Sequence, residues 1–152
     1  NKNLKKRFWN DLYTLAKKDY NLTPEASIEK YIDLCKYTIA SDKIKKIHRH
    51  QNILYRVEFN KLDEKIHFYR GKWGLFFEYN INRIDELKKI INKKYQTLTY
   101  FGVDTSLLKN FVINNKLKGI DRVVPVGQSL DISLMWDGYD IVSTLSRCIE
   151  IK

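Results

Sequence analysis

The stretch TLTYFGVDTSLLKNFVINNKLKGIDRVVPV, residues 97–126, carries the periodicities that decide the fold class. Short apolar runs at 97–101 and 122–126 predict two strands, of which the second is expected to be buried. Between them, apolar residues recur with the period of a helix, at Leu107, Leu108, Phe111, Val112 and Leu117. Gly119 is expected to end this helix in a left-handed cap. A helix joined by short links to a strand on either side is typical of a parallel sheet, so the sequence predicts an α/β fold.

Toward the N-terminus the same reasoning predicts two helices. Residues 4–16 place apolar side chains on one helical face and lysines on the other. Thr23, Pro24 and Glu25 have the order of an N-cap, a first-turn proline and a first-turn acid, and they open a second helix that extends to Ile39. These helices are expected to pack against the sheet.

The middle of the chain changes to a strand-like period of two. Residues 53–59 alternate, and 66–70 and 73–79 continue the pattern around two glycines that suggest a hairpin or a bulged crossover. The charged segment 41–51 is interpreted as a surface turn or a frayed helix end. Residues 84–91 are predicted to be a short helix.

Toward the C-terminus follow the run Asp121-Arg122-Val123-Val124-Pro125-Val126-Gly127-Gln128-Ser129-Leu130-Asp131 and then Trp136-Asp137-Gly138-Tyr139-Asp140. A strand that ends in Pro-x-Gly-Gln brings amides and polar side chains to the carboxyl edge of a parallel sheet, where α/β proteins bind ligands. The candidate pocket residues are Pro125, Gly127, Gln128, Asp131, Trp136, Asp137, Gly138 and Tyr139. The alternative is purely structural: the proline and glycine turn the chain, the tryptophan fills the core, and Asp137 caps a last helix that reaches Cys148.

These two runs resemble the C-terminal end of the LuxC-type long-chain fatty acyl-CoA reductases, relatives of the aldehyde dehydrogenases. The resemblance is close over 119–147, looser from Trp73, and upstream of that only one of order and composition. It implies a partial three-layer, aldehyde-dehydrogenase-like catalytic domain with a mostly parallel sheet and N-terminal helices, in which 1–152 is the C-terminal part of a longer enzyme's catalytic domain. This part walls the substrate pocket and contributes to subunit contacts.

The family passes an acyl group from coenzyme A to a cysteine thiolate, and hydride from NADPH then releases a fatty aldehyde. By resemblance, both that cysteine and the NADPH-binding domain lie upstream of the matched portion. No catalytic residue is therefore expected in this chain, and the isolated chain is expected to be inactive. The full-length enzyme is expected to be a homo-oligomer that acts on fatty acyl-CoA, with acyl-transferring enzymes as partners. Some members of the family serve bioluminescence, which does not by itself assign that role here.

Length and charge restrict the alternatives. A chain of 152 residues fits one domain, and because it begins at Asn1 while its only methionine is Met135, we expect that upstream polypeptide has been removed. The net charge of +10 would attract polyanions, but the lysines are scattered among Asn and Ile, as codon bias alone can produce. Nucleic acid is therefore not expected as a partner. A small basic RNA- or protein-binding module using Lys43–Arg49 remains the alternative. No apolar run approaches the roughly 20 residues that span a bilayer.

Cysteine and histidine usage adds no catalytic or metal centre. Cys35 and Cys148 belong to no CxxC pair, which indicates reduced thiols and a cytoplasmic location. Cys35 lies on the apolar stripe of a predicted helix and is interpreted as a filler instead of a nucleophile. His48 and His50 are assigned to a solvated turn, so no metal is predicted. The aromatic residues of 68–79 either line an acyl channel or fill the core, and the sequence leaves both open.

Overall fold

The computed structural model describes residues 2–151. Contacts within the chain divide it into two compact units, Asn1–Asn82 and Arg83–Lys152. The sequence patterns predicted one domain without a visible linker, so this division is a feature that they did not reveal. The assignment of 1–152 to the C-terminal part of a larger catalytic domain stays a prediction.

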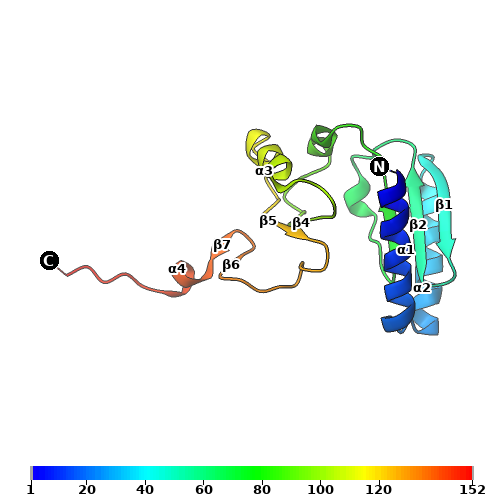
Figure 1. Ribbon diagram of the computed structural model, residues 1–152, viewed down its shortest axis with the longest axis horizontal. Coiled ribbons are helices and arrows are strands. Elements are labelled where there is room, and N and C mark those ends of the chain that lie inside the picture. Colours follow the sequence, from blue (N-terminus) through cyan, green and yellow to red (C-terminus); the bar gives the residue numbers. More distant parts are fainter. Residues whose placement is uncertain (1, 152) are drawn as a thin grey trace. The chain divides into compact units, whose positions relative to one another are not determined.

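The first unit is built from two helices and a three-stranded sheet (Figure 1). Its elements are α1 (Lys2–Asp19), α2 (Pro24–Ala40), β1 (Ile44–His50), β2 (Leu54–Phe59) and β3 (Leu75–Glu78). The strand order is β1-β2-β3, with β1 antiparallel and β3 parallel to the central β2. Because β2 and β3 are parallel, the segment between them is a crossover, so the hairpin alternative for this region is wrong.

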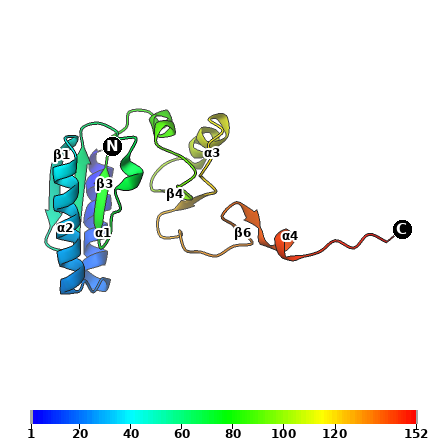
Figure 2. The ribbon, with the colours of Figure 1, turned by 180° about the vertical axis from the view of Figure 1, so that it is seen from behind.

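The two helices cover opposite faces of this sheet (Figures 1 and 2). The alternation of β3 shows why. Phe76 points to α1, where its ring centroid lies 5.3 Å from that of Trp9. Phe77 points the other way, to α2, where its ring lies 5.3 Å from that of Tyr37. Since successive side chains of a strand leave on opposite faces, one strand contacts both helices. The first unit is therefore a three-layer α/β/α arrangement.

The core lies between α2 and the sheet. Five buried residues form it, Leu34, Tyr55, Val57, Phe59 and Leu75, with partly buried side chains around them that include Tyr69, Phe77 and Tyr79. These last three belong to the aromatic set that the sequence assigned either to an acyl channel or to the core, and for them the core interpretation is confirmed. Phe68 and Trp73 of the same set are exposed.

Three local predictions for this unit can be compared with the structure. The cap of α2 is confirmed, since the Thr23 hydroxyl accepts a hydrogen bond from the Ala26 amide at 3.2 Å and Pro24 begins the helix. The segment 41–51 is not a surface turn, because it contains β1. A bulge between Ile44 and Lys46 hides the strand, since one extra residue breaks the period of two. Residues 66–68 form a 3-10 turn, not a strand.

The second unit contains a βαβ segment followed by small irregular elements. They are η2 (Ile84–Lys89), β4 (Thr97–Tyr100), α3 (Thr105–Asn114), β5 (Arg122–Pro125), β6 (Met135–Trp136), β7 (Tyr139–Asp140) and α4 (Ile141–Leu145). Strands β4 and β5 pair in parallel, as the sequence predicted from the helix between them. Strands β6 and β7 pair antiparallel. The chain is therefore a mixed α/β protein. It contains both parallel and antiparallel strand pairs and not a mostly parallel sheet.

Two expectations for this unit are wrong in detail. Strand β5 is not buried: Val123 is 37% exposed and its neighbours are only partly covered. Gly119 does not cap α3, because the helix already ends at Asn114 and Lys116 takes the left-handed conformation with φ of 48°. From Asn115 to Gly119 the chain forms turns and bends and is no longer helical.

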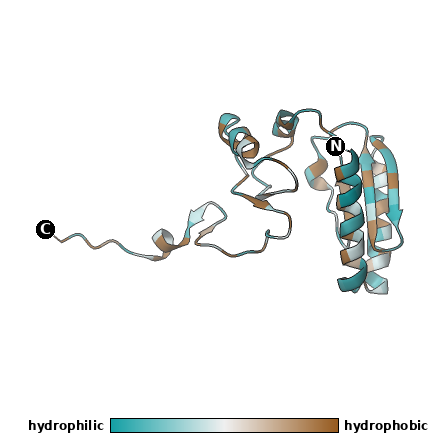
Figure 3. Cartoon of the chain, in the orientation of Figure 1, coloured by the Kyte–Doolittle hydropathy of each residue, from teal (hydrophilic) through white to brown (hydrophobic). Residues whose placement is uncertain are grey.

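Large apolar side chains lie at the surface of the second unit. Leu130 and Ile132 are 85% and 84% exposed, and the residues that follow include Leu145 and Ile149 with similar exposure. Figure 3 shows this alternation of hydrophobic and hydrophilic residues along the C-terminal segment, in contrast to the predominantly hydrophilic α1. Among the described residues, no helix has both the length and the apolar character that a membrane span requires.

Candidate functional site

The candidate site is the loop of residues 121–140, which contains every pocket residue that the sequence singled out. Its organising side chain is Arg122 on β5. The guanidinium donates hydrogen bonds to the carbonyl oxygens of Ser129 at 2.9 Å and Asp131 at 2.8 Å. It also lies over the Trp136 ring, 4.3 Å from the centroid. One charged group thus ties the two conspicuous sequence runs together.

A cavity of about 340 Å³ lies within this loop. Its polar wall includes Asp121, Arg122, Gln128, Asp131 and Ser133, and backbone of Gly138 completes it. Gln128 is exposed, and its side chain makes no hydrogen bond to any residue of the described range 2–151. Gln128, one of the candidate pocket residues of the sequence, is therefore able to donate to, or accept from, a ligand amide or carbonyl.

The backbone between β5 and the hairpin is a series of turns. The Val126 amide donates to the Tyr100 carbonyl oxygen at 3.0 Å, which extends the pairing of β4 and β5 beyond Pro125. Gly127 follows with φ of 97°, and the Gln128 amide returns to the Pro125 oxygen at 3.1 Å. The predicted turning role of Pro125 and Gly127 is confirmed, and it places Gln128 just past the carboxyl end of β5.

Asp137 and Gly138 form the two-residue turn between β6 and β7. Their φ values of 51° and 81° are both positive, as a type I′ hairpin turn requires, and Asp-Gly is a favoured pair for that turn. A Cβ atom at position 138 would lie 3.3 Å from the Asp121 carboxylate. The turn brings Trp136 and Tyr139 opposite each other in the strand pair, where Trp136 is half-buried under Arg122 and Tyr139 is exposed.

The last helix is capped by Asp140, so the assignment of this role to Asp137 is wrong. The Asp140 carboxylate accepts from the amides of Val142 at 3.0 Å and Ser143 at 3.3 Å, and from the Ser143 hydroxyl at 2.7 Å. The hydroxyl and amide of Ser143 lower the pKa of Asp140, and the Val142 amide acts in the same direction. Helix α4 ends at Leu145, so Cys148 lies beyond it.

The sequence reasoning therefore missed two residues of this site. Asp140 could have been found, because an N-cap stands directly before the first apolar residue of a helix, here Ile141. Arg122 had no such signal, since its three partners lie 7 to 14 positions later and no spacing rule connects them.

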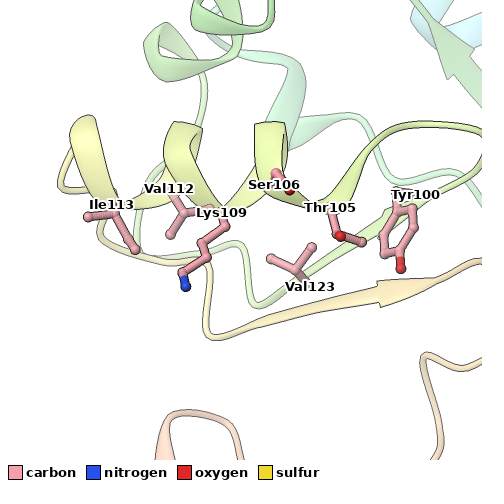
Figure 4. A pocket seen from close by; sticks show the side chains of 7 residues that line it. All are labelled: Tyr100, Thr105, Ser106, Lys109, Val112, Ile113 and Val123. Atoms are coloured by element: carbon pink, nitrogen blue, oxygen red, sulfur yellow. The ribbon is translucent and has the colours of Figure 1, made fainter.

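A second cavity of about 400 Å³ in the same unit lies between α3 and the two parallel strands (Figure 4). Its walls are Val112 and Ile113 of α3 and Val123 of β5, while Tyr100, Lys109 and two hydroxyl residues at the start of α3 line the rest. This is an apolar trough with an amine and hydroxyl groups beside it. Such a trough fits an apolar tail better than a highly charged ligand.

In the first unit, two neighbouring carboxylates on the sheet form ion pairs, and one of them, Glu78, holds α1 to the sheet. Glu58 and Glu78 are register partners on β2 and β3. Glu58 binds Lys45 at 3.0 Å and His48 at 3.5 Å. Glu78 binds Lys5 of α1 at 3.0 Å and Arg56 at 2.8 Å, and it accepts a hydrogen bond from the Trp9 indole at 3.1 Å.

These ion pairs bear on two sequence interpretations. His48 and His50 lie on β1 and are half-buried, so the solvated turn is wrong for them. Within residues 2–151, no three side chains of His, Cys, Asp or Glu gather in a group that could hold a metal ion. In the basic segment 43–49, Lys43 is paired with Asp63 at 3.1 Å and Lys45 with Glu58, so part of its charge is already neutralised.

The cysteines lie away from these sites. Cys35 is half-buried on α2, and no described side chain hydrogen-bonds its sulfur; Cys148 is exposed in the C-terminal segment. No protein-family model, curated protein or solved structure matches this chain.

Proposed function

We propose that this chain is the C-terminal portion of the catalytic domain of a LuxC-type, NADPH-dependent fatty acyl-CoA reductase, with the partial aldehyde-dehydrogenase-like fold that this implies. The proposal is carried by the two sequence runs of residues 121–131 and 136–140. Support comes from their convergence on Arg122, because residues scattered over the runs meet around one guanidinium and one cavity. Two runs that served only to turn the chain would not need that convergence.

The parallel pair β4 and β5 adds support, because a βαβ crossover is the unit from which such a sheet is built. Exposed apolar residues such as Leu130, Ile132 and Leu145 point the same way, since apolar surface of this kind is normally covered by other polypeptide. In the proposed enzyme that cover comes from the rest of the catalytic domain and from subunit contacts in a homo-oligomer.

In this proposal the chain's own residues bind and orient the acyl substrate. Gln128 hydrogen-bonds a polar group of fatty acyl-CoA, and the apolar trough between α3 and β5 takes part of the acyl tail. Arg122 is a positioning residue that fixes the loop carrying Gln128. Cysteine of the upstream portion accepts the acyl group, and bound NADPH supplies the hydride that releases the aldehyde. We assign no residue of this chain to NADPH or to the attacking thiol.

The test uses the isolated chain and its full-length parent with fatty acyl-CoA and NADPH in a cytoplasm-like buffer, following NADPH absorbance. The parent is expected to form aldehyde and the isolated chain to form none. In the parent, Gln128→Ala is expected to raise the KM for acyl-CoA by roughly tenfold, the loss of about one hydrogen bond. Gln96→Ala, an exposed glutamine of the same unit whose backbone alone is engaged, is the matched control.

Either of two results would count against the proposal: aldehyde formation by the isolated chain, or a parent without an aldehyde-dehydrogenase-like cysteine and without reductase activity. The latter outcome, combined with RNA affinity that falls steeply with salt, would favour the basic binding module. That alternative has less support, because Lys43 and Lys45 of its proposed surface are held by carboxylates.

A further inference from the structure

A pocket of about 410 Å³ in the first unit has no role in the proposed reductase chemistry. It lies where the first turns of α2 approach the end of β1 and the start of β2. Its lining residues are Ser27, Ile28, Tyr31, Arg49, Asn52 and Tyr55. A volume of this size is in the range of ligand pockets, which begin at roughly 300 Å³.

Arg49 is held over the pocket by aromatic contacts. Its guanidinium lies 4.8 Å from the ring centroid of Tyr55 and 5.8 Å from that of Tyr31. One of its nitrogens donates to the Tyr55 hydroxyl at 2.9 Å, and that hydroxyl donates to the Asn52 side-chain oxygen at 3.1 Å. The side chain is thus oriented while other donors of the guanidinium are not used by any described residue.

Lys30 lies directly behind this wall and is fully buried, with 0% exposure. Its amine donates to the backbone oxygens of Asn52 and, at 3.0 Å, of Ile53, and it lies 4.7 Å from the Tyr55 ring centroid. Burial lowers the pKa of Lys30 to about 8, and the nearby positive charge of Arg49 acts in the same direction. Two cations therefore share one site.

No carboxylate of the described residues compensates them. The ion pairs of the first unit involve other cations, and Glu29, which precedes Lys30 on α2, accepts from the Trp73 indole at 2.9 Å. A buried ammonium beside a guanidinium without a counter-ion is costly, and an anion in the pocket would relieve that cost. An anion that balances both Lys30 and Arg49 has to carry two negative charges.

We propose that this pocket binds the phosphate group of a phosphomonoester carried on a flat ring. A phosphomonoester carries a charge of roughly −1.5 to −2 near neutral pH, which matches two cations, whereas a carboxylate carries only one negative charge. Arg49 is the direct ligand and Lys30 acts through the field behind it. The exposed ring of Tyr31 and the side chain of Ile28 offer a surface on which a flat ring can stack, and the pocket is larger than bare phosphate needs.

The test is a calorimetric titration of the full chain with phenyl phosphate, inorganic phosphate and benzoate at neutral pH. Phenyl phosphate is expected to bind at least tenfold more tightly than either of the others. NMR of the Lys30 amine provides a second measurement, in which the pKa is expected to rise from about 8 on saturation. Arg49→Gln should reduce affinity at least tenfold, because Arg49 is the direct ligand. Since Arg49 is exposed, the variant is expected to keep the fold.

Lys46→Gln is the matched control, since it removes the same charge from an exposed position of the same strand. Equal losses for the two variants would mean general charge attraction and would overturn the proposal. Benzoate binding as tightly as phenyl phosphate would overturn the choice of phosphate, and absence of binding at millimolar concentration would overturn the site. The reductase assay is independent of these results, because the pocket and the 121–140 loop belong to different units.

Discussion

Replacing Arg122 with methionine is predicted to loosen the whole candidate site. Methionine keeps most of the length and apolar character of the side chain but removes the two hydrogen bonds to the Ser129 and Asp131 oxygens and the contact with the Trp136 ring. In this partly exposed position water competes for the charge, so each hydrogen bond contributes about 1 kcal/mol, and the cation–π contact contributes about 0.5 kcal/mol. The expected loss is about 2.5 kcal/mol, or roughly 70-fold in the opening equilibrium.

The assay is denaturant unfolding of the full chain labelled with fluorinated tryptophan and followed by fluorine NMR. The chain has three tryptophans, and each gives its own signal. Trp9 and Trp73 report the first unit and Trp136 reports the second. The Trp136 transition is expected to move to lower denaturant by an amount that corresponds to about 2.5 kcal/mol, while the other two signals keep their midpoints.

Arg147→Met is the control, because Arg147 is an exposed arginine of the same unit and none of the described residues pairs with it. Its Trp136 transition should stay within about 0.5 kcal/mol of the unsubstituted chain, as for an ordinary surface position. An equally small change for Arg122→Met would refute the argument that one guanidinium holds the loop. In the full-length parent, the same substitution is expected to lower kcat/KM for acyl-CoA if the loop orients the substrate.

Three further predictions concern other contacts. Trp9→Ala should destabilise the first unit by about 3 kcal/mol, measured from the Trp73 signal, because α1 loses the contacts of Trp9 with Phe76 and Glu78. Leu15→Ala, at a position 58% exposed on the same helix, should cost under about 1 kcal/mol. Hydrogen bonding from Lys45 lowers the pKa of Glu58. The stabilising contribution of the Glu58 carboxylate is therefore present above its unfolded-state pKa of about 4.3 and is lost as the pH falls through the folded-state value. Glu58→Gln should remove that part of the acid dependence of unfolding, and an unchanged profile would contradict this assignment. Gly138→Ala should cost about 1 kcal/mol in the Trp136 transition because φ is 81°, and no loss there would argue against the type I′ turn.

Local signals in the sequence predicted what local physics controls. The cap of α2 at Thr23 depends on a few adjacent residues. The parallel pairing of β4 and β5 followed from the order strand, helix, strand with short links, because a helical crossover is the usual connection between parallel strands. The signals failed where an irregularity interrupted a period. The bulge in β1 made a strand resemble a charged turn, and residues 66–68 alternate like a strand but close into a 3-10 turn.

The candidate site divides in the same way. The turn at Pro125 and Gly127 was identified correctly, because the fixed φ of proline and the positive φ open to glycine are properties of single residues. The turn at Asp137 and Gly138 was not, since the sequence reasoning gave Asp137 to a helix cap that Asp140 provides. The role of Arg122 was not predictable, since it depends on a loop that brings Ser129, Asp131 and Trp136 to one guanidinium.

The sequence by itself determined the α/β class, the two N-terminal helices and the segment that forms the candidate site, because periodicity, caps and turn residues act within a few positions of the chain. Only the tertiary structure decided that the helices cover opposite faces of one sheet, that Glu58 and Glu78 lie side by side, and that Lys30 is buried next to Arg49. The physical reason is that burial, pairing of charges and the lack of a counter-ion depend on distances between residues far apart in sequence, and no local pattern encodes those distances.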